Sequence, residues 1–211
     1  MVDSSNAKNQ AAPGRTGGCK AGVSERAVSV TKRFLLDVML GRLARWLRAL
    51  GHNAAYDHAA DDPSLLRRAA RERRLLVTRD TRLAATPRGP RTILLRANDT
   101  PGQLRELVEA LGITRHPGLL SRCIVCNTRL RTATADQVEE RVPEYVRSRE
   151  RAFRACPGCG RVYWAGTHRR GIIAALESAL PDLGVRPGGP GRRWGRTPRR
   201  EQGTLNGKEP R

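Results

Sequence analysis

Long apolar runs are missing from this 211-residue sequence. No stretch approaches the roughly 20 apolar residues that a membrane span needs, and no apolar signal segment opens the chain. Hydrophobic residues make up 38% of the composition and aromatic residues only 4%. Such a chain can build one ordinary domain with a small appendage. We therefore expect a cytoplasmic protein without membrane association.

Both ends of the chain also lack the apolar periodicity of folded elements. Residues 1–32 are rich in Ser, Gly, Ala and Lys, and residues 181–211 contain Pro187-Gly-Gly-Pro-Gly191 followed by an arginine run. Segments of this kind bury too little apolar surface to offset their chain entropy. We expect residues 1–32 and 181–211 to be disordered tails, and the second of them to be basic.

Acidic residues and lysine are both scarce. The chain has 40 basic against 20 acidic residues, a net charge of +20, and only four of the basic residues are lysines. The two tails hold 13 basic and 5 acidic residues, so the region between them keeps 27 and 15. An arginine-rich proteome is one explanation of this excess, and a polyanionic partner is the other. We favour the partner, with nucleic acid as its most common class.

Short apolar runs alternate with helical patterns between residues 33 and 118. Strands are predicted at 34–36, 54–56, 75–78 and 92–95, because each is a short apolar run bounded by polar or turn residues. Leucine and alanine recur at helical spacing in the segments between them. This alternation predicts an α/β domain over residues 33–118, in which helices cover both faces of a parallel sheet.

Aspartates stand where two of these strands end and where one helix begins. Asp37 and Asp80 follow apolar runs directly, and Asp62-Pro63 predicts a helix start with Asp62 as the N-cap. Ligands bind beyond the carboxyl ends of parallel strands, so the three carboxylates should converge at one edge. Clustered carboxylates repel unless a cation joins them, and oxygen ligands suit Mg²⁺ or Mn²⁺. The alternative is that each aspartate only caps a helix or turn.

Four cysteines form the pairs Cys123-Ile-Val-Cys126 and Cys156-Pro-Gly-Cys159. Asn127 and Gly160 follow the pairs, and both residue types suit a left-handed turn. Two such turns supply four thiolates in the tetrahedral geometry that Zn²⁺ prefers. Disulfides are the alternative, but they would suit a short secreted chain. All four ligands would come from the protein, so we predict a structural zinc in a ribbon over residues 119–180.

The two halves together resemble the Mut-seven C-terminal RNase domain family, which combines a PIN-like fold with a zinc ribbon. The matching stretches span residues 33–180 and include 34–51, Leu76-Val-Thr-Arg-Asp80, Arg122-Cys-Ile-Val-Cys-Asn127, Val142-Pro-Glu-Tyr-Val146 and 156–168. The resemblance implies a metal-dependent ribonuclease.

The acidic residues of that family map onto Asp37 and Asp80, and onto Asp62 or its neighbour Asp61. A fourth acidic position could only be Asp99. The competing functions are a non-catalytic RNA-binding protein and a toxin-type nuclease, although minimal toxins need no ribbon.

Cations and rings interleave in the second half of the ribbon, as in surfaces that stack unpaired bases. One of Tyr163 and Trp164 is expected only to cover the zinc site. His168 could donate a proton, contact phosphate or form a structural hydrogen bond. We expect contacts with single-stranded RNA from Arg45 and Arg48 of the first helix, and from Arg161, Trp164 and His168.

Overall fold

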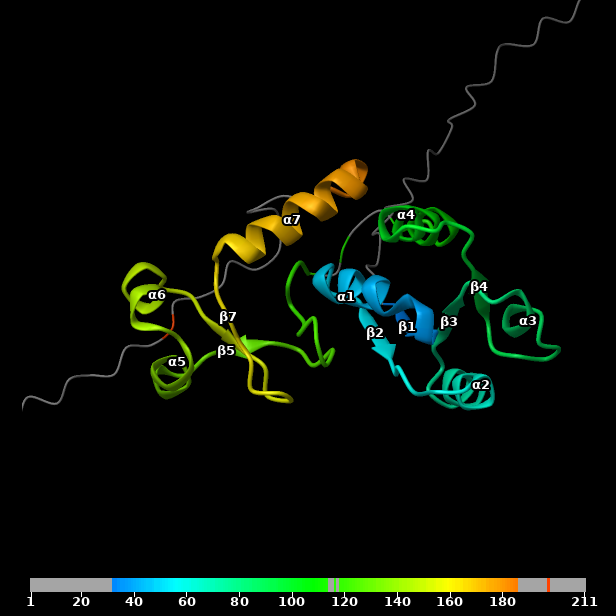
Figure 1. Cartoon of the computed structure of the whole chain (residues 1–211), viewed down its shortest axis with the longest axis horizontal. Coiled ribbons are helices and arrows are strands. Elements are labelled where there is room, and N and C mark those ends of the chain that lie inside the picture. Colours follow the sequence, from blue (N-terminus) through cyan, green and yellow to red (C-terminus); the bar gives the residue numbers. More distant parts are fainter. Residues whose placement is uncertain (1–31, 114–115, 117, 186–196, 198–211) are drawn as a thin grey trace, which may run out of the picture.

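The computed structural model describes residues 32–113, 116, 118–185 and 197 (Figure 1). A sheet domain (residues 32–113) precedes a small ribbon (residues 121–166), and one long helix follows. The elements of the sheet domain are β1 (Arg33–Leu36), η1 (Val38–Leu40), α1 (Gly41–Ala49), β2 (Asn53–Tyr56), α2 (Asp62–Arg71), β3 (Leu75–Thr78), α3 (Thr81–Ala84), β4 (Thr92–Leu94) and α4 (Thr100–Ala110). Those that follow are β5 (Arg131–Thr132), α5 (Ala135–Arg141), α6 (Glu144–Arg149), β6 (Arg154–Ala155), β7 (Val162–Tyr163), α7 (Thr167–Ala179) and η2 (Pro181–Leu183).

The sheet domain is built on four parallel strands in the order β2-β1-β3-β4. The chain runs from β1 outward to β2 and then crosses back to β3 on the other side of β1. Leu36 lies opposite Val77, so β1 and β3 end side by side. The order of the strands therefore reverses between β1 and β3, which is where open parallel sheets bind their ligands.

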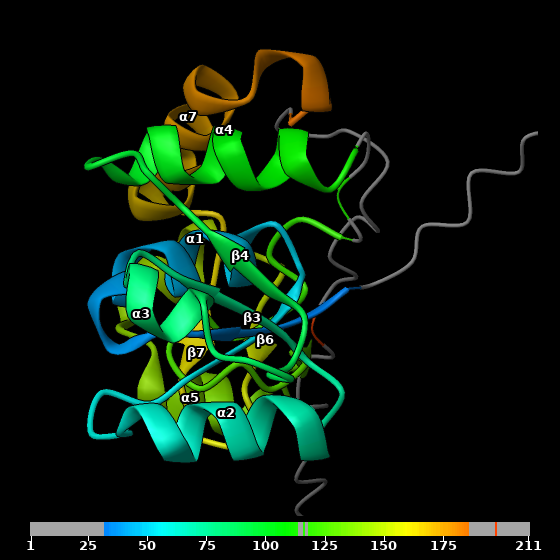
Figure 2. The same ribbon diagram turned by 90° about the vertical axis from the view of Figure 1, so that its right-hand side faces the viewer.

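Successive side chains of the central strands point to opposite faces of the sheet, so each face has its own hydrophobic core. Phe34 and Leu36 face a core completed by α1, α4 and α7, whereas Leu35 faces a smaller core under α2 and α3. Figure 2 shows α4 and α7 above the sheet and α2 below it. Each of these fully buried side chains contributes roughly 1.5–3 kcal/mol relative to exposure. The predicted parallel sheet with helices on both faces is confirmed.

The ribbon has a three-stranded antiparallel sheet in the order β5-β6-β7, with α5 and α6 beside it. Thr134 and Gln137 form a reciprocal capping box that fixes the start of α5. Its small core holds Val138, Val142 and Phe153. A core of this size gives the ribbon little apolar burial of its own.

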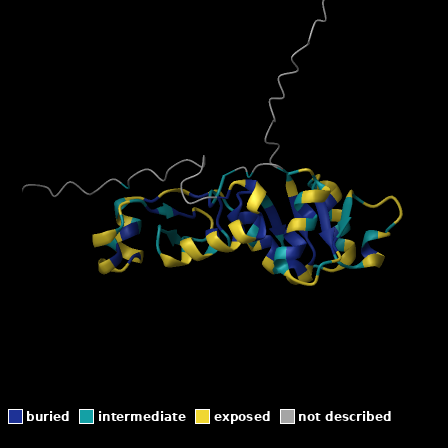
Figure 3. Cartoon of the chain, turned by 90° about the horizontal axis from the view of Figure 1, so that it is seen from above, coloured by how far each residue is buried: buried dark blue, intermediate teal, exposed yellow. Residues whose placement is uncertain are grey.

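Helix α7 leaves the ribbon and packs on the sheet domain, as Figure 1 shows in yellow and orange. Ile173 and Leu176 are buried in the same core as Phe34. In Figure 3 the helices present exposed surface outward and buried surface inward. The ribbon is thus tied to the sheet domain at both of its ends.

The disordered tail was expected to begin at residue 181, but residues 181–185 are part of the folded structure. Leu183 and Val185 are buried in the large core, and Gly184 makes a left-handed turn between them. Thr197 also pairs with the ribbon, since its N–H donates to Arg151 and its hydroxyl accepts from the Phe153 N–H. The rest of the predicted tails, residues 1–31, 186–196 and 198–211, lies outside the described residues.

None of the helices in the described part of the chain combines the length and apolarity that crossing a membrane requires.

Candidate functional site

Asp37 is a buried carboxylate at the crossover between β1 and β3, with 3% of its surface exposed. Its N–H donates to the Val77 carbonyl and so continues the strand pairing by one residue. One carboxylate oxygen accepts from the Val38 N–H at 2.5 Å, and the other accepts from the Thr78 hydroxyl at 2.5 Å. A carboxylate oxygen has two lone pairs, so each keeps one for a further partner.

Thr78 links the two strand-end aspartates. Its hydroxyl donates to Asp37 and accepts from the Asp80 N–H at 2.8 Å. The Asp80 carboxylate caps α3, and both N–H groups that it binds, those of Arg82 and Leu83, reach the same oxygen. Thr78 therefore connects the Asp37 carboxylate to the backbone of Asp80. Sequence reasoning did not single out Thr78, although its place two residues before Asp80 was a signal.

The helix start near residue 62 differs from the prediction. Asp61 is the N-cap of α2, where its carboxylate accepts from the Ser64 N–H at 2.9 Å, and Asp62 is the first helical residue. Hydrogen bonding to the Ser64 side chain and to the Ser64 N–H lowers the pKa of Asp61. Because the Asp61 carboxylate already accepts the capping hydrogen bond, Asp62 is the better candidate of the two for binding a metal ion. Asp99 likewise caps α4 by accepting from the Gly102 N–H.

The aspartates do not form a closed metal cage. Among the described residues, the four cysteines are the one group of three or more acidic, histidine or cysteine side chains gathered closely enough to hold a metal ion. Asp37 and Asp80 are connected only through Thr78, which binds the Asp37 carboxylate and the Asp80 N–H. Mg²⁺ and Mn²⁺ keep several non-protein ligands, so one or two carboxylates are enough to hold either ion.

The cysteine cluster matches its predicted arrangement. The sulfurs of Cys123, Cys126, Cys156 and Cys159 all lie within 4.8 Å of one another. A tetrahedral zinc with bonds of about 2.3 Å places its sulfurs about 3.8 Å apart. Asn127 and Gly160 adopt φ values of 69° and 72°, as the turns require. Four cysteine ligands fill a zinc coordination shell, so this site could hold a structural ion.

Hydrogen bonds and burial shift the pKa values of Cys126 and Cys156 in opposite directions. Burial opposes ionisation of Cys126, but hydrogen bonding with Thr128 and contacts with Cys156 and Cys123 lower its pKa to about 6. Burial and contact with Cys126, at 3.2 Å between the sulfurs, raise the pKa of Cys156. Arg161 bonds to Cys159, and this contact raises the pKa of the arginine. A zinc tetrathiolate carries two negative charges, which cations at its edge partly offset.

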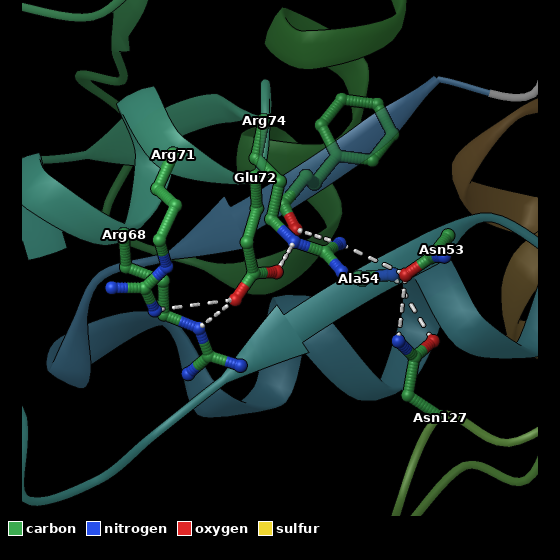
Figure 4. Close-up of polar contacts among 8 residues, drawn as sticks. Asn53, Ala54, Arg68, Arg71, Glu72, Arg74 and Asn127 are labelled. Atoms are coloured by element: carbon green, nitrogen blue, oxygen red, sulfur yellow. Dashed lines mark hydrogen bonds and ion pairs between the residues drawn. The ribbon is translucent and has the colours of Figure 1, made fainter.

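Asn127 joins the first cysteine turn (residues 123–127) to the sheet. Its side chain accepts from the Ala54 N–H at 3.1 Å and donates to Asn53 at 2.8 Å. Asn53 also accepts from Arg74, which in turn bonds to Glu72 and to the Phe34 carbonyl (Figure 4). This chain of contacts runs from the end of α2 across β1 and β2 to the cysteine turn.

Arg48 does not lie on the outer surface of α1 as expected. It is buried, with 5% of its surface exposed, and donates to the carbonyls of Ala54, Ile124 and Val125. The expectation that Arg48 contacts RNA is therefore wrong in its premise of an exposed side chain. Arg45, three residues earlier on α1, is exposed as predicted.

The expected RNA residues of the ribbon lie in two places. Arg161 is exposed beside Cys159, whereas Trp164 and His168 line a cavity. The Tyr163 hydroxyl contacts the Cys123 sulfur at 3.0 Å, so Tyr163 is the ring that covers the cysteine cluster. Trp164 packs partly on the ribbon core, and His168 is exposed in the first turn of α7.

A family model described as Mut7-C RNAse domain matches residues 32–176. The matched span contains both strand-end aspartates and all four cysteines of the cluster. No curated protein and no solved structure matches the chain.

Proposed function

The chain belongs to the Mut7-C RNAse domain family, and from this premise we propose that it is a metal-dependent ribonuclease acting on single-stranded RNA. The observation that supports the proposal best is the buried Asp37 carboxylate at the crossover of a parallel sheet, linked through Thr78 to Asp80. Burying a carboxylate is costly, and a capping role does not require burial. A cation held at this point would offset that cost.

Asp37 and Asp80 would hold Mg²⁺ or Mn²⁺, with Asp62 as a third ligand from the start of α2. The bound ion would activate water and stabilise the leaving oxygen of a phosphodiester. The protein's own part is to hold the two carboxylates in place. Hydrogen bonds from Val38 and Thr78 hold Asp37, and those from Arg82 and Leu83 hold Asp80.

The remaining parts of the molecule fit binding of RNA. The net charge of +20 favours a polyanion, and Arg45, Arg161, Trp164 and His168 offer cations and rings. We assign Zn²⁺ to the four cysteines as a structural ion that stabilises the ribbon. We place the protein in the cytoplasm.

Replacement of Asp37 and Asp80 by asparagine tests this function. Asp37→Asn and Asp80→Asn should each lower cleavage of labelled single-stranded RNA in Mn²⁺ at least about 100-fold, because the charge that holds the cation is lost while the shape is kept. Glu109→Gln, an exposed change of the same charge on α4, is the matched control and should cleave at the wild-type rate. Zinc content, melting temperature and RNA affinity are measured for every variant.

The alternative function is a non-catalytic RNA-binding protein. Asp61, Asp80 and Asp99 do cap helices, which favours this alternative. If Asp37→Asn and Asp80→Asn both cleave like the wild type, or if the wild type does not cleave with any divalent ion, the nuclease proposal fails.

A further inference from the structure

A cavity of about 540 Å³ lies in the ribbon, away from the strand-end aspartates. Its lining comes from α6, β7, the start of α7 and parts of residues 120–130, which include the first cysteine pair. Figure 1 shows α6, β7 and the start of α7 together on the ribbon side of the molecule. Pockets that hold small organic groups have volumes of roughly 300–1,000 Å³, so the cavity has the size of a ligand site.

Three aromatic residues line this cavity, and one of them, Tyr145, is largely exposed to solvent. Tyr163 covers the cysteine cluster and Trp164 packs on the ribbon core. Tyr145 on α6 is 68% exposed, a high value for so large a ring. The first two rings are fixed by the fold, whereas Tyr145 adds little to the core and is free to contact a ligand.

The lining is basic as well as aromatic. Arg149 and Arg170 are exposed at the cavity, and Glu150 is the single acid among the described residues that line it. The first turn of the 13-residue helix α7 also reaches the cavity, and its N-cap Gly166 has no side chain to bind the free N–H groups. Cations beside aromatic rings complement a group with a flat π face and an adjacent phosphate.

We propose that the cavity holds the base of one unpaired RNA nucleotide, with Tyr145 stacked on the base and with Arg149 and Arg170 against its phosphate. The identity of the polymer rests on the proposed function. The site is separate from the aspartates, so the protein holds an RNA strand at a second point. A paired base is not available for such insertion, which favours single-stranded RNA. An apolar peptide is a poorer occupant, because it would leave the arginines without anionic partners.

Binding of a labelled single-stranded RNA to the full chain tests the site, measured by fluorescence anisotropy without added Mg²⁺ or Mn²⁺. Tyr145→Ala should weaken binding by about fivefold or more, the low end of what one stacked base contributes. Tyr145→Phe keeps the ring and should stay within about twofold of the wild type. Arg170→Gln should weaken binding more than Arg105→Gln, an exposed helical arginine outside the cavity that loses the same charge.

An oligomer of the same length whose nucleotides lack bases makes the test specific. The Tyr145→Ala variant and the wild type should bind this abasic strand equally, since no base is present to stack. Equal binding of ordinary RNA by these two proteins, or an equal loss on both strands, overturns the proposal. So does a full chain that does not bind RNA at all.

These outcomes are independent of the nuclease test. A protein that shows the base-dependent Tyr145 effect without cleaving RNA keeps the cavity site and loses the proposed catalytic function. A protein that cleaves RNA but binds it equally well with and without the Tyr145 ring keeps the proposed catalytic function and loses the cavity site.

Discussion

His52 is buried in the sheet domain, with 2% of its surface exposed and its ring edge-on to Phe34. Within the described residues, neither of its ring nitrogens has a hydrogen-bond partner. Burial, together with the positive charges of His116, Arg122 and Lys32, lowers the pKa of His52 to about 4. The folded protein therefore holds a neutral imidazole at neutral pH.

This environment predicts a loss of stability in mild acid. The unfolded chain binds a proton at His52 below about pH 6.5, while the folded protein resists protonation until about pH 4. Stability is thus fully present above pH 6.5 and falls as the pH drops toward 4, with His52 accounting for ~2 kcal/mol between pH 8 and pH 5. Urea unfolding at several pH values should show a smaller loss for His52→Leu than for the wild type. Parallel pH curves for the two proteins would contradict this explanation, because protonation of the cysteines affects both alike.

Single residues were predicted well where the neighbouring sequence determines their position. Asn127 and Gly160 follow their cysteine pairs directly, and both adopt the predicted left-handed conformation. Arg45 and Arg48 lie three residues apart on one helix, yet one is exposed and the other is buried. The partners that bury Arg48 are the carbonyls of residues 54, 124 and 125, and no local pattern indicates that they meet it.

At the scale of elements, strands were found because each is a short apolar run, and the parallel order followed from the helices between them. The length of α7 and the burial of its apolar face could not be predicted in the same way. Ile173 and Leu176 indicate an apolar stripe, but the surface that covers it belongs to α1 and α4, over sixty residues earlier. Contacts across such separations depend on the whole fold rather than on local periodicity.

The start of α2 distinguishes a capping aspartate from a candidate metal ligand. Asp61→Ala should lower the melting temperature measurably, because it removes the cap on the Ser64 N–H. Asp62→Ala should lower it less, since this residue contributes only its charge to the first helical turn. Thermal unfolding measures both losses. Asp62→Asn should reduce RNA cleavage without lowering stability, whereas Asp61→Asn should leave both unchanged. If Asp61→Asn reduces RNA cleavage and Asp62→Asn does not, Asp61 is the metal ligand.

At the scale of the whole molecule, the ribbon and the sheet domain form one connected structure. The first cysteine turn is bonded to α1 through Arg48 and to β2 through Asn127. Helix α7 then returns from the ribbon to the large core. These two connections join the ribbon, which carries the cavity, to the sheet domain, which carries the strand-end aspartates.

Two truncated chains distinguish what the C-terminal segment contributes to stability by packing from what it contributes to RNA binding by its charge. A chain of residues 32–180 loses the buried Leu183 and Val185 and the Thr197 hydrogen bonds. Two buried aliphatic side chains contribute roughly 3 kcal/mol or more, so its melting temperature should fall by roughly 6 °C or more. A chain of residues 32–197 keeps these contacts and should melt like the full chain.

The longer truncation then tests the charge alone. Removing residues 1–31 and 198–211 deletes 8 basic and 4 acidic residues, which lowers the net charge from +20 to +16. RNA affinity should weaken and its dependence on salt should flatten, because fewer counterions are released from the RNA. Turnover at saturating RNA should not change, because both candidate sites remain intact. An unchanged salt slope for residues 32–197 would mean that the removed segments do not contact RNA. A melting temperature of residues 32–180 equal to that of 32–197 would mean that Leu183 and Val185 do not stabilise the core.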